Sequence, residues 1–378
     1  MPYWRLSGFY FFYFATLGVL VPYWSLYLQS IDFTPVDIGN LIAVLMLSRI
    51  VAPVIWGWIA DHREQRMAVV RLASFLAVVA YSGVFLGASF WWLAAVMALF
   101  SFFWHASLPL LEVFVMHHTA ARPGAYGRVR LWGSIGFIIT VMALGLVIDE
   151  YGPWWVLPAL LLLILGIWLS SLSLPESEMK GAVAHAGPLR AVLLRPEVFA
   201  FLLACLLMQM SHGPYYTFYS IYLEDYGYSK TIIGSLWAFA VVCEIGVFLS
   251  MQRLLARVSL RAVLIVSFLL AVVRWLLIGY FPENLSVLVM AQAMHAATFG
   301  SFHASAIQLV HRFFTGRHRH RGQAIYGSLS FGIGGAVGSF YSGHAWATLG
   351  PEITFSIASG CAGLAFLVAV LLIRHDRS

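Results

Sequence analysis

The chain has 378 residues, of which 61% are hydrophobic and only 10% are charged, and its formal net charge is +6. A soluble domain carries roughly 25% charged residues, so this composition excludes a soluble globular fold and indicates a protein whose surface faces lipid. The basic residues are spread through short loops and form no groove-sized patch, which argues against nucleic-acid binding.

Apolar runs long enough to span a bilayer recur along the whole chain. A transmembrane helix needs about 20 apolar residues. Such runs are expected at approximately 4–28, 36–60, 67–88, 90–118, 127–148, 153–173, 197–223, 231–252, 262–281, 284–311, 323–347 and 350–373. The sequence therefore predicts an all-α membrane protein with twelve transmembrane helices.

The loops between these runs differ in charge from one side to the other. Cationic residues gather in alternate loops, at Arg63, Arg66, Arg122, Arg128, Lys180, Arg190, Arg195, Arg253, Arg257, Arg261, Arg312, Arg317, Arg319 and Arg321. The opposite loops carry one cation, Lys230, and several acids, among them Asp149 and Glu150. Because cytoplasmic loops are enriched in Lys and Arg, we expect both termini in the cytoplasm.

An internal repeat divides the chain into two parts. At an offset of 195, Gly18, Ser25, Tyr27, Leu28, Gly39 and Leu41 fall on Gly213, Ser220, Tyr222, Leu223, Gly234 and Leu236. We expect pseudo-symmetric six-helix halves at residues 1–173 and 196–378, joined by a cytoplasmic linker at 174–195. Two six-span repeats in one orientation are typical of parallel-repeat secondary transporters, whose substrate site lies near the midplane at the repeat interface.

Two ionisable residues occupy equivalent positions in the repeat. Arg49 and Glu244 each lie ten residues after a paired glycine and about thirteen residues into a span. Charges at such depth are costly and tend to face a cavity or a partner. We expect these two either to form an ion pair across the pathway or to share a substrate and a proton; a purely structural pair is the alternative.

Further polar residues interrupt other spans. Glu112 and Arg130 lie at similar depths on consecutive spans, and His105 shares the helix face of Glu112. These residues are expected either to bind substrate or to form a structural clasp. Arg274 and His295 lie at comparable depths on spans nine and ten, which suggests a proton-coupling site because imidazole titrates near neutral pH. A histidine satisfied within the core is the alternative.

Aromatic residues accompany these groups on the spans expected to line the cavity. His212 precedes a Gly-Pro break and several tyrosines, and we interpret this segment as cavity-lining. The aromatic candidates for the binding site are Trp24, Tyr27, Tyr215 and Tyr216, and for each of them a place in the interface belt or in helix packing is the alternative. The intramembrane inventory of three arginines against two glutamates favours an anionic ligand, because arginine binds a carboxylate through two hydrogen bonds. Aromatic walls with one cation suit an aryl carboxylic acid.

The loop GWIADHREQR at 57–66 resembles the signature loop of the major facilitator superfamily. The matching positions are Gly57, Asp61, Arg63 and Arg66, whereas His62 and Glu64 depart from the pattern. The resemblance implies that this loop acts as a cytoplasmic gate.

A closer resemblance covers the whole chain. The segments PYWSLYL (22–28), LPLLE (108–112), YGRVRLWGSIGF (126–137), HGPYYTFYSIYL (212–223) and VVRW (272–275) resemble the phenylpropionate permease family, which is related to lactose and nucleoside proton symporters. The resemblance implies a proton-coupled importer in the bacterial inner membrane. The acid that the sugar symporters carry on span ten has no counterpart between Ala291 and Val310, and Glu244 or Glu112 are the candidates to replace it.

We therefore expect a monomeric secondary transporter that imports a small aromatic carboxylate such as 3-phenylpropionate together with protons. A sugar or nucleoside symporter is the alternative, and a drug or metabolite exporter is the third. The histidines lack the spacing of membrane metalloenzymes, so we expect no enzyme activity, no metal site and no cofactor.

Overall fold

The computed structural model describes residues 2–63, 65–119, 124–176 and 189–373, and every regular element within these ranges is a helix. Contacts group the chain into two compact units. Unit 1 comprises Met1–Ala182 and Tyr228–Ala238, and unit 2 comprises Val183–Gly227 and Phe239–Ser378. One helix, α10 (Lys230–Leu255), begins in unit 1 and ends in unit 2.

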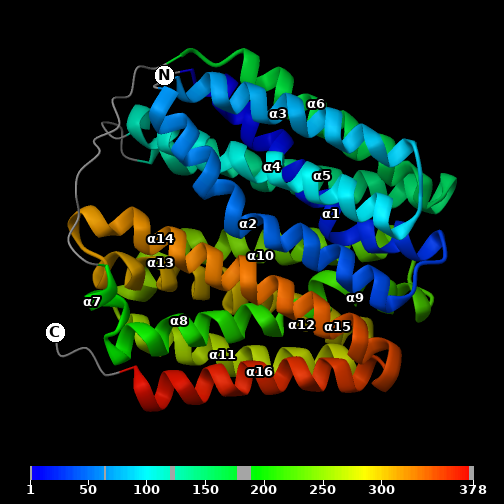
Figure 1. Cartoon of the computed structure of the whole chain (residues 1–378). Coiled ribbons are helices and arrows are strands. Elements are labelled where there is room, and N and C mark those ends of the chain that lie inside the picture. The colour runs from blue at the N-terminus through cyan, green and yellow to red at the C-terminus, as the bar shows by residue number, and fades with distance from the viewer. Residues whose placement is uncertain (1, 64, 120–123, 177–188, 374–378) are drawn as a thin grey trace. The chain divides into compact units, whose positions relative to one another are not determined.

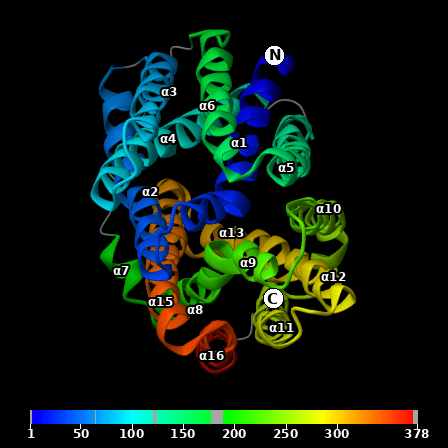
Figure 2. The same ribbon diagram turned by 90° about the vertical axis from the view of Figure 1, so that its right-hand side faces the viewer.

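Unit 1 is a bundle of long helices (Figure 1). In chain order it contains α1 (Tyr3–Ser30), α2 (Pro35–Arg63), α3 (Arg66–Ser82), η1 (Gly83–Phe85), α4 (Phe90–Thr119), α5 (Ala125–Tyr151), η2 (Pro153–Trp155) and α6 (Val156–Leu172). The helix α1 packs against α5 and α6, and α4 packs against α2 and α3 (Figure 2).

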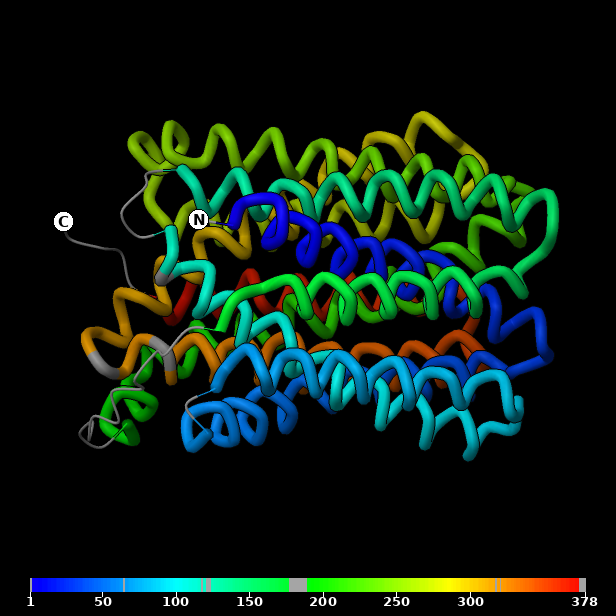
Figure 3. The backbone as a smooth tube through the Cα atoms, turned by 90° about the horizontal axis from the view of Figure 1, so that it is seen from above, coloured from blue at the N-terminus to red at the C-terminus, as the bar shows by residue number. Residues whose placement is uncertain are grey.

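Unit 2 repeats this architecture with more interruptions. It contains α7 (Arg190–Leu193), α8 (Pro196–Ser211), α9 (Gly213–Asp225), α11 (Leu260–Tyr280), α12 (Leu285–Ala293), η3 (Ala296–Ser301), α13 (Phe302–Phe313), η4 (Gly316–His318), α14 (Arg319–Gly327), η5 (Ser328–Gly334), α15 (Gly335–Leu349) and α16 (Pro351–Leu372). The helix α16 packs against α8 and α11, and α9 packs against α15. Within each unit the long helices run roughly along one direction (Figure 3).

Each predicted span corresponds to one helix or to a run of consecutive helices. Within the described residues, eleven helical segments are long and apolar enough to cross a membrane. The remaining predicted span, 323–347, corresponds to α14, η5 and α15, where a π-helical turn interrupts the α-helix. The Gly-Pro break predicted after His212 is the point at which α8 ends and α9 begins.

Two glycines at equivalent positions of the repeat each lie at a close crossing of two helices. A Cβ atom at Gly18 would lie 2.9 Å from the carbonyl oxygen of Phe137 on α5, and one at Gly213 would lie 2.3 Å from the backbone of Gly338 on α15. Only glycine allows the helix backbones to approach this closely. The same repeat position therefore marks a tight helix crossing in each unit.

Arginines close the ends of two helices. The last carbonyls of a helix have no partner within it. In unit 1, Arg71 donates to the Leu174 carbonyl beyond α6 at 2.5 Å, and Arg5 donates to the Ser173 carbonyl at 3.0 Å. In unit 2, Arg261 donates to the carbonyls of Ile373 and Val370 at the end of α16, at 2.6 and 2.7 Å.

Much of the predicted linker 174–195 lies outside the described residues, and only its two edges are described. At the first edge the Glu176 carboxylate accepts the backbone N–H of Met67 at 3.0 Å, at the start of α3. Arg122, Lys180 and the C-terminal basic residues also lie outside the described ranges.

Candidate functional site

Arg274 is the centre of a polar cluster inside unit 2. Its side chain is fully buried in α11. Its Nε donates to the Ala291 carbonyl at 2.9 Å, Nη2 donates to Oε1 of Gln292 at 3.1 Å, and Nη1 donates to Oγ1 of Thr298 at 3.1 Å. The guanidinium also lies over the Tyr215 ring, 4.3 Å from its centroid. These bonds compensate a buried cation that would otherwise be strongly unfavourable.

Glu244 and His295 form a close pair beside this centre. Nε2 of His295 lies 3.8 Å from Oε2 of Glu244, and the two side chains are 6% and 17% exposed. The His295 ring stacks on Phe299 with a centroid separation of 5.2 Å. Gly300 in the π-helical turn leaves room for the glutamate, because a Cβ there would lie 3.1 Å from its Cγ. A buried imidazole and a partly exposed carboxylate thus lie within ion-pair distance of each other.

The aromatic segment after α8 completes the cluster. Tyr215 donates its hydroxyl hydrogen to Oε1 of Gln292 at 2.9 Å, so this amide oxygen accepts from both Tyr215 and Arg274. His212 places Nδ1 2.8 Å from the Met208 carbonyl, and its ring meets Trp275 edge-on. Because a carbonyl only accepts, Nδ1 of His212 carries the hydrogen.

Several buried nitrogens of the cluster lack a hydrogen-bond partner. Within the part of the chain that is described, this holds for Nε2 of His212, Nε2 of Gln292 and Nδ1 of His295. Buried polar atoms are nearly always hydrogen-bonded, and an exception marks a place where a function must be sought. Three such atoms lie in this one cluster, which makes it the candidate site of unit 2.

A second polar cluster lies in unit 1, between α2 and α4. Arg49 donates its Nε–H to Nε2 of His105 at 3.0 Å, and Nδ1 of His105 lies 2.7 Å from the Ser48 hydroxyl. His105 is 5% exposed. Sequence reasoning placed His105 on the face of Glu112, but its hydrogen-bond partners are on α2.

Glu112 and Arg130 lie among aromatic side chains of unit 1. The Tyr126 hydroxyl donates to Oε1 of Glu112 at 3.4 Å. The guanidinium of Arg130 lies over the Phe14 ring, 3.9 Å from its centroid, and 5.9 Å from that of Tyr10. A carboxylate, a phenol and a cation on α4 and α5 are therefore presented beside α1.

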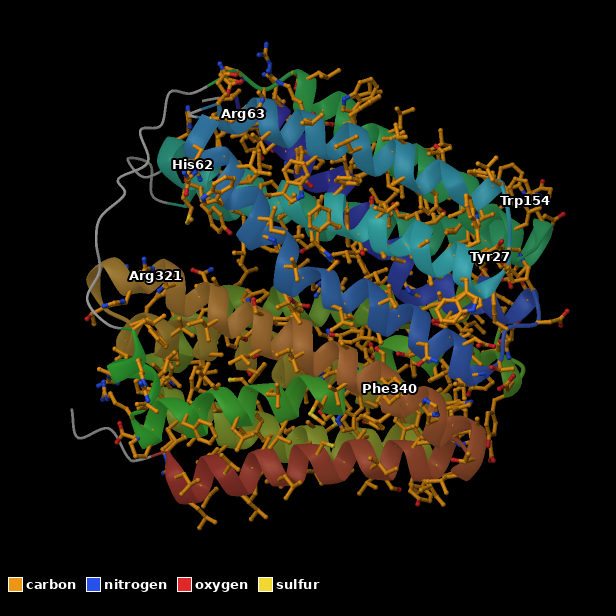
Figure 4. All side chains as sticks on the ribbon, in the orientation of Figure 1. Tyr27, His62, Arg63, Trp154, Arg321 and Phe340 are labelled. Atoms are coloured by element: carbon orange, nitrogen blue, oxygen red, sulfur yellow. The ribbon has the colours of Figure 1, made fainter. Side chains whose placement is uncertain are left out.

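The two aromatic candidates on α1 are buried near its end. Trp24 and Tyr27 have ring centroids 5.4 Å apart. Figure 4 shows Tyr27 at the end of unit 1 where Trp154 lies, whereas His62 and Arg63 lie at the opposite end. This places Trp24 and Tyr27 toward one membrane face of the unit.

The predicted gating loop connects α2 and α3. Asp61 accepts from Nη2 of Arg66 at 2.6 Å, which closes the loop on itself. A Cβ atom at Gly57 would meet nothing within 4 Å, so this glycine is not required by packing in the present conformation. Arg63 is the last residue of α2, and Glu64 lies outside the described residues.

At the other end of unit 1, Asp149 caps the start of α10. Its carboxylate accepts the backbone N–H groups of Lys230 and Thr231, both at 2.8 Å, and the Thr231 hydroxyl at 2.6 Å. Sequence reasoning used Asp149 only as a marker of orientation. A lone acid at a helix end gives no sequence signal of which helix it caps.

Sequence reasoning also missed Gln292 and Thr298. A glutamine inside an otherwise apolar span is the signal that could have found the first, since an amide in hydrocarbon must have partners. Among the described residues, no group of three His, Cys, Asp or Glu side chains is arranged to hold a metal ion.

The chain matches one protein family and is similar to several known transporters. A protein-family model, described as the MFS_1 like family, matches residues 3–357 of the chain. The chain is 28% identical to the "Probable 3-phenylpropionic acid transporter" of Escherichia coli (strain K12), over 94% of each chain. It is 25% identical to the "Maltose permease" of Geobacillus stearothermophilus, over 98% of this chain and 94% of that one. The crystal structure of the nucleoside transporter NupG superposes over 100% of both chains with a TM-score of 0.85, at 16% identity.

Proposed function

Since the chain belongs to the MFS_1 like family, it is a multi-pass membrane transporter and not an enzyme, and we propose that it imports a small aromatic carboxylate together with protons. The family match and the likeness in fold to NupG support a secondary transporter with two six-helix halves. The proposed halves are residues 1–173 and 196–378, and transport follows by alternating access of these parallel repeats. We place the protein as a monomer in the bacterial inner membrane with both termini in the cytoplasm.

The observation that carries the proposal is the Glu244–His295 pair with unpartnered nitrogens around it. A partly exposed carboxylate lies 3.8 Å from a buried imidazole, and both groups can take up and release protons. Nδ1 of His295 and Nε2 of His212 have no partner among the described residues, so they are free to meet a polar group of a ligand. Glu244 is the proposed proton carrier, which replaces the acid absent from span ten.

Arg274 has a different proposed role from Glu244. Its three nitrogens already donate to Ala291, Gln292 and Thr298. These bonds use three of the five N–H groups of Arg274 and fix the orientation of its side chain in the core. We therefore propose that Arg274 holds the cluster together.

The proposed substrate class rests on charge and on aromatic lining. The intramembrane residues are three arginines, Arg49, Arg130 and Arg274, against two glutamates, Glu112 and Glu244, which favours an anion. Tyr215, Trp275 and Phe299 surround the cluster. The relative of Escherichia coli (strain K12) named as a probable 3-phenylpropionic acid transporter supports an aryl carboxylate.

A sugar or nucleoside is the second candidate substrate. The Glu112 carboxylate, the Tyr126 hydroxyl and the Arg130 guanidinium beside the Phe14 ring offer donors, acceptors and an apolar face to a polyhydroxylated ring. The names of the maltose permease and of NupG agree with this candidate. Export of a drug or metabolite is less well supported, because the intramembrane arginines outnumber the intramembrane glutamates.

The experiment uses protein in liposomes with an inward proton gradient. Uptake of labelled 3-phenylpropionate is followed beside that of maltose and a nucleoside, for wild type and Glu244→Gln. We expect gradient-driven accumulation of the carboxylate in wild type. In the variant we expect loss of accumulation but retention of exchange between labelled and unlabelled substrate, because only the proton step is removed. Accumulation of maltose or the nucleoside alone would refute the substrate, and full accumulation by Glu244→Gln would refute the proton carrier.

A further inference from the structure

His212 lies at the junction of two helices in unit 2, where α8 ends and α9 begins with Gly213 and Pro214. Its side chain is fully buried. The Nδ1 atom lies 2.8 Å from the Met208 carbonyl oxygen, whereas Nε2 has no hydrogen-bond partner among the described residues. One ring nitrogen is therefore bound by the protein and the other is not.

The bound nitrogen fixes the state of the imidazole. A carbonyl oxygen only accepts hydrogen bonds, so Nδ1 of His212 carries a hydrogen. In a protonated ring Nε2 would carry a second hydrogen, and the ring would be a fully buried cation with one donor unpaired, which is strongly unfavourable. The ring is therefore neutral, and Nε2 carries a lone pair that can only accept.

A buried acceptor at this position restricts the ligand group that can meet it. An ionised carboxylate only accepts hydrogen bonds, so it has no hydrogen to give to Nε2 of His212. A hydroxyl or an N–H group has one. A ligand without such a donor leaves the acceptor unsatisfied, and an unsatisfied buried acceptor weakens binding relative to a ligand that pairs with it.

Aromatic side chains surround the His212 ring. Tyr216 stacks on it with a centroid separation of 5.6 Å, and Trp275 and Phe299 meet it edge-on with separations of 4.8 and 6.5 Å. Aromatic rings favour stacked and edge-to-face contacts with one another. The part of a ligand that suits these surroundings is an aromatic ring, and the donor that such a ring carries is a phenolic hydroxyl.

We propose that His212 is a specificity-determining residue whose Nε2 accepts the hydrogen of a phenolic hydroxyl, so that the preferred substrate is a hydroxylated aryl carboxylate. This inference rests on the proposed function and narrows its substrate class. The hydroxyl reaches Nε2 when the site is open to substrate during alternating access. The carboxylate end of the substrate lies away from His212.

The first experiment compares ligands that differ in a single atom or group. Binding to the purified wild-type protein is measured by titration calorimetry for 3-phenylpropionate, for its three ring-hydroxylated isomers and for the three fluorinated counterparts. Fluorine is similar in size to a hydroxyl group but has no hydrogen to donate. We expect at least one hydroxylated isomer to bind about tenfold more tightly than the acid with fluorine at the same position.

The second experiment assigns this preference to His212. His212→Leu removes the acceptor, and we expect it to abolish the preference for the hydroxyl over fluorine. His212→Gln can place an amide oxygen near the position of Nε2, and we expect it to recover most of the preference. His344→Leu, at an exposed position of α15, is the matched control and should keep the wild-type preference. Binding of unsubstituted 3-phenylpropionate by a variant shows that it is folded.

Three outcomes would overturn the inference. They are wild-type protein that binds no hydroxylated isomer more tightly than its fluorinated counterpart, an unchanged preference in His212→Leu, and equal loss of all the aryl acids in that variant. The comparison in wild type decides the donor requirement even if no variant folds. Failure of the proposed function is seen separately, in wild-type protein that binds none of the aryl acids but does bind maltose or a nucleoside.

Discussion

Replacing Asp149 by alanine should loosen the first turn of α10 while leaving the rest of the helix intact. The first four N–H groups of a helix have no partner inside it. In α10 those of Lys230 and Thr231 donate to Asp149, and those of Ile232 and Ile233 donate to the hydroxyl and the carbonyl of Ser229. Two of the four therefore depend on the substituted residue, and two do not.

The expected loss of local stability follows from the contacts that the Asp149 carboxylate makes. Loss of a capping side chain typically costs about 1 kcal/mol. Loss of a negative charge at an exposed helix N-terminus adds about 0.3–1 kcal/mol. Asp149 is exposed, so water replaces part of what is lost. A local destabilisation of about 1.5 kcal/mol corresponds to roughly tenfold faster amide exchange.

Hydrogen–deuterium exchange of the purified protein measures this directly. Exchange is followed in peptides that cover residues 226–238 for wild type, Asp149→Ala and Glu150→Gln. We expect about tenfold faster exchange at the Lys230 and Thr231 amides in Asp149→Ala, and unchanged exchange at Ile232 and Ile233. Glu150→Gln alters an adjacent exposed acid and serves as the control.

The reasoning would be wrong if Asp149→Ala left the Lys230 and Thr231 amides as slow as in wild type. It would also be wrong if all four amides of the turn accelerated together, because the whole turn would then depend on Asp149. Acceleration in Glu150→Gln to the same extent would point to surface charge in general.

Three further predictions concern stability, measured as the melting temperature in detergent. Gly213→Ala should lower the melting temperature, because a Cβ 2.3 Å from the Gly338 backbone costs about 1–3 kcal/mol or more in overpacking, which exceeds the gain of about 1 kcal/mol in helix propensity. Gly57→Ala should raise the melting temperature, because open space surrounds its Cβ and only the gain in propensity remains. Equal shifts in the two variants would contradict both predictions. Arg261→Met should lower the melting temperature, because it removes the hydrogen bonds to Ile373 and Val370. The expected loss of stability is about 1–2 kcal/mol, because the site is partly exposed, and it should be smaller for Arg261→Lys. Tyr215→Phe should cost about 1 kcal/mol through its bond to Gln292, and a neutral result would show that this bond is not formed in the protein.

The architecture could be predicted from the sequence because the bilayer constrains it strongly. A span must be apolar over about 20 residues, so each predicted run corresponds to a helix or to a helix with one interruption. The predicted resemblance to the major facilitator superfamily is confirmed by the match over residues 3–357. The repeat was also visible in sequence, because a close helix crossing tolerates only glycine at Gly18 and Gly213.

The partners of the polar residues were harder to predict. Position along a helix gives depth and face, but it does not say which neighbouring helix lies against that face. His105 could be placed on the helix face of Glu112, but the sequence could not tell that α2 supplies its partners Ser48 and Arg49. Arg274 and His295 were predicted to lie at one depth, and in the structure both lie beside the Tyr215 ring. The expected ion pair between Arg49 and Glu244 stays a prediction.

The π-helical turns at Ala296–Ser301 and Ser328–Gly334 bear on how the length of this chain can change in evolution. A π turn holds one residue more than an α turn. Deletion of one residue inside it can restore an α-helix and leave the rest of the span in register. The same deletion in an uninterrupted helix such as α16 would rotate every later side chain by about 100°. Relatives that lack these turns should therefore align with single-residue gaps at these two places, and insertions or deletions elsewhere in the spans should be rare.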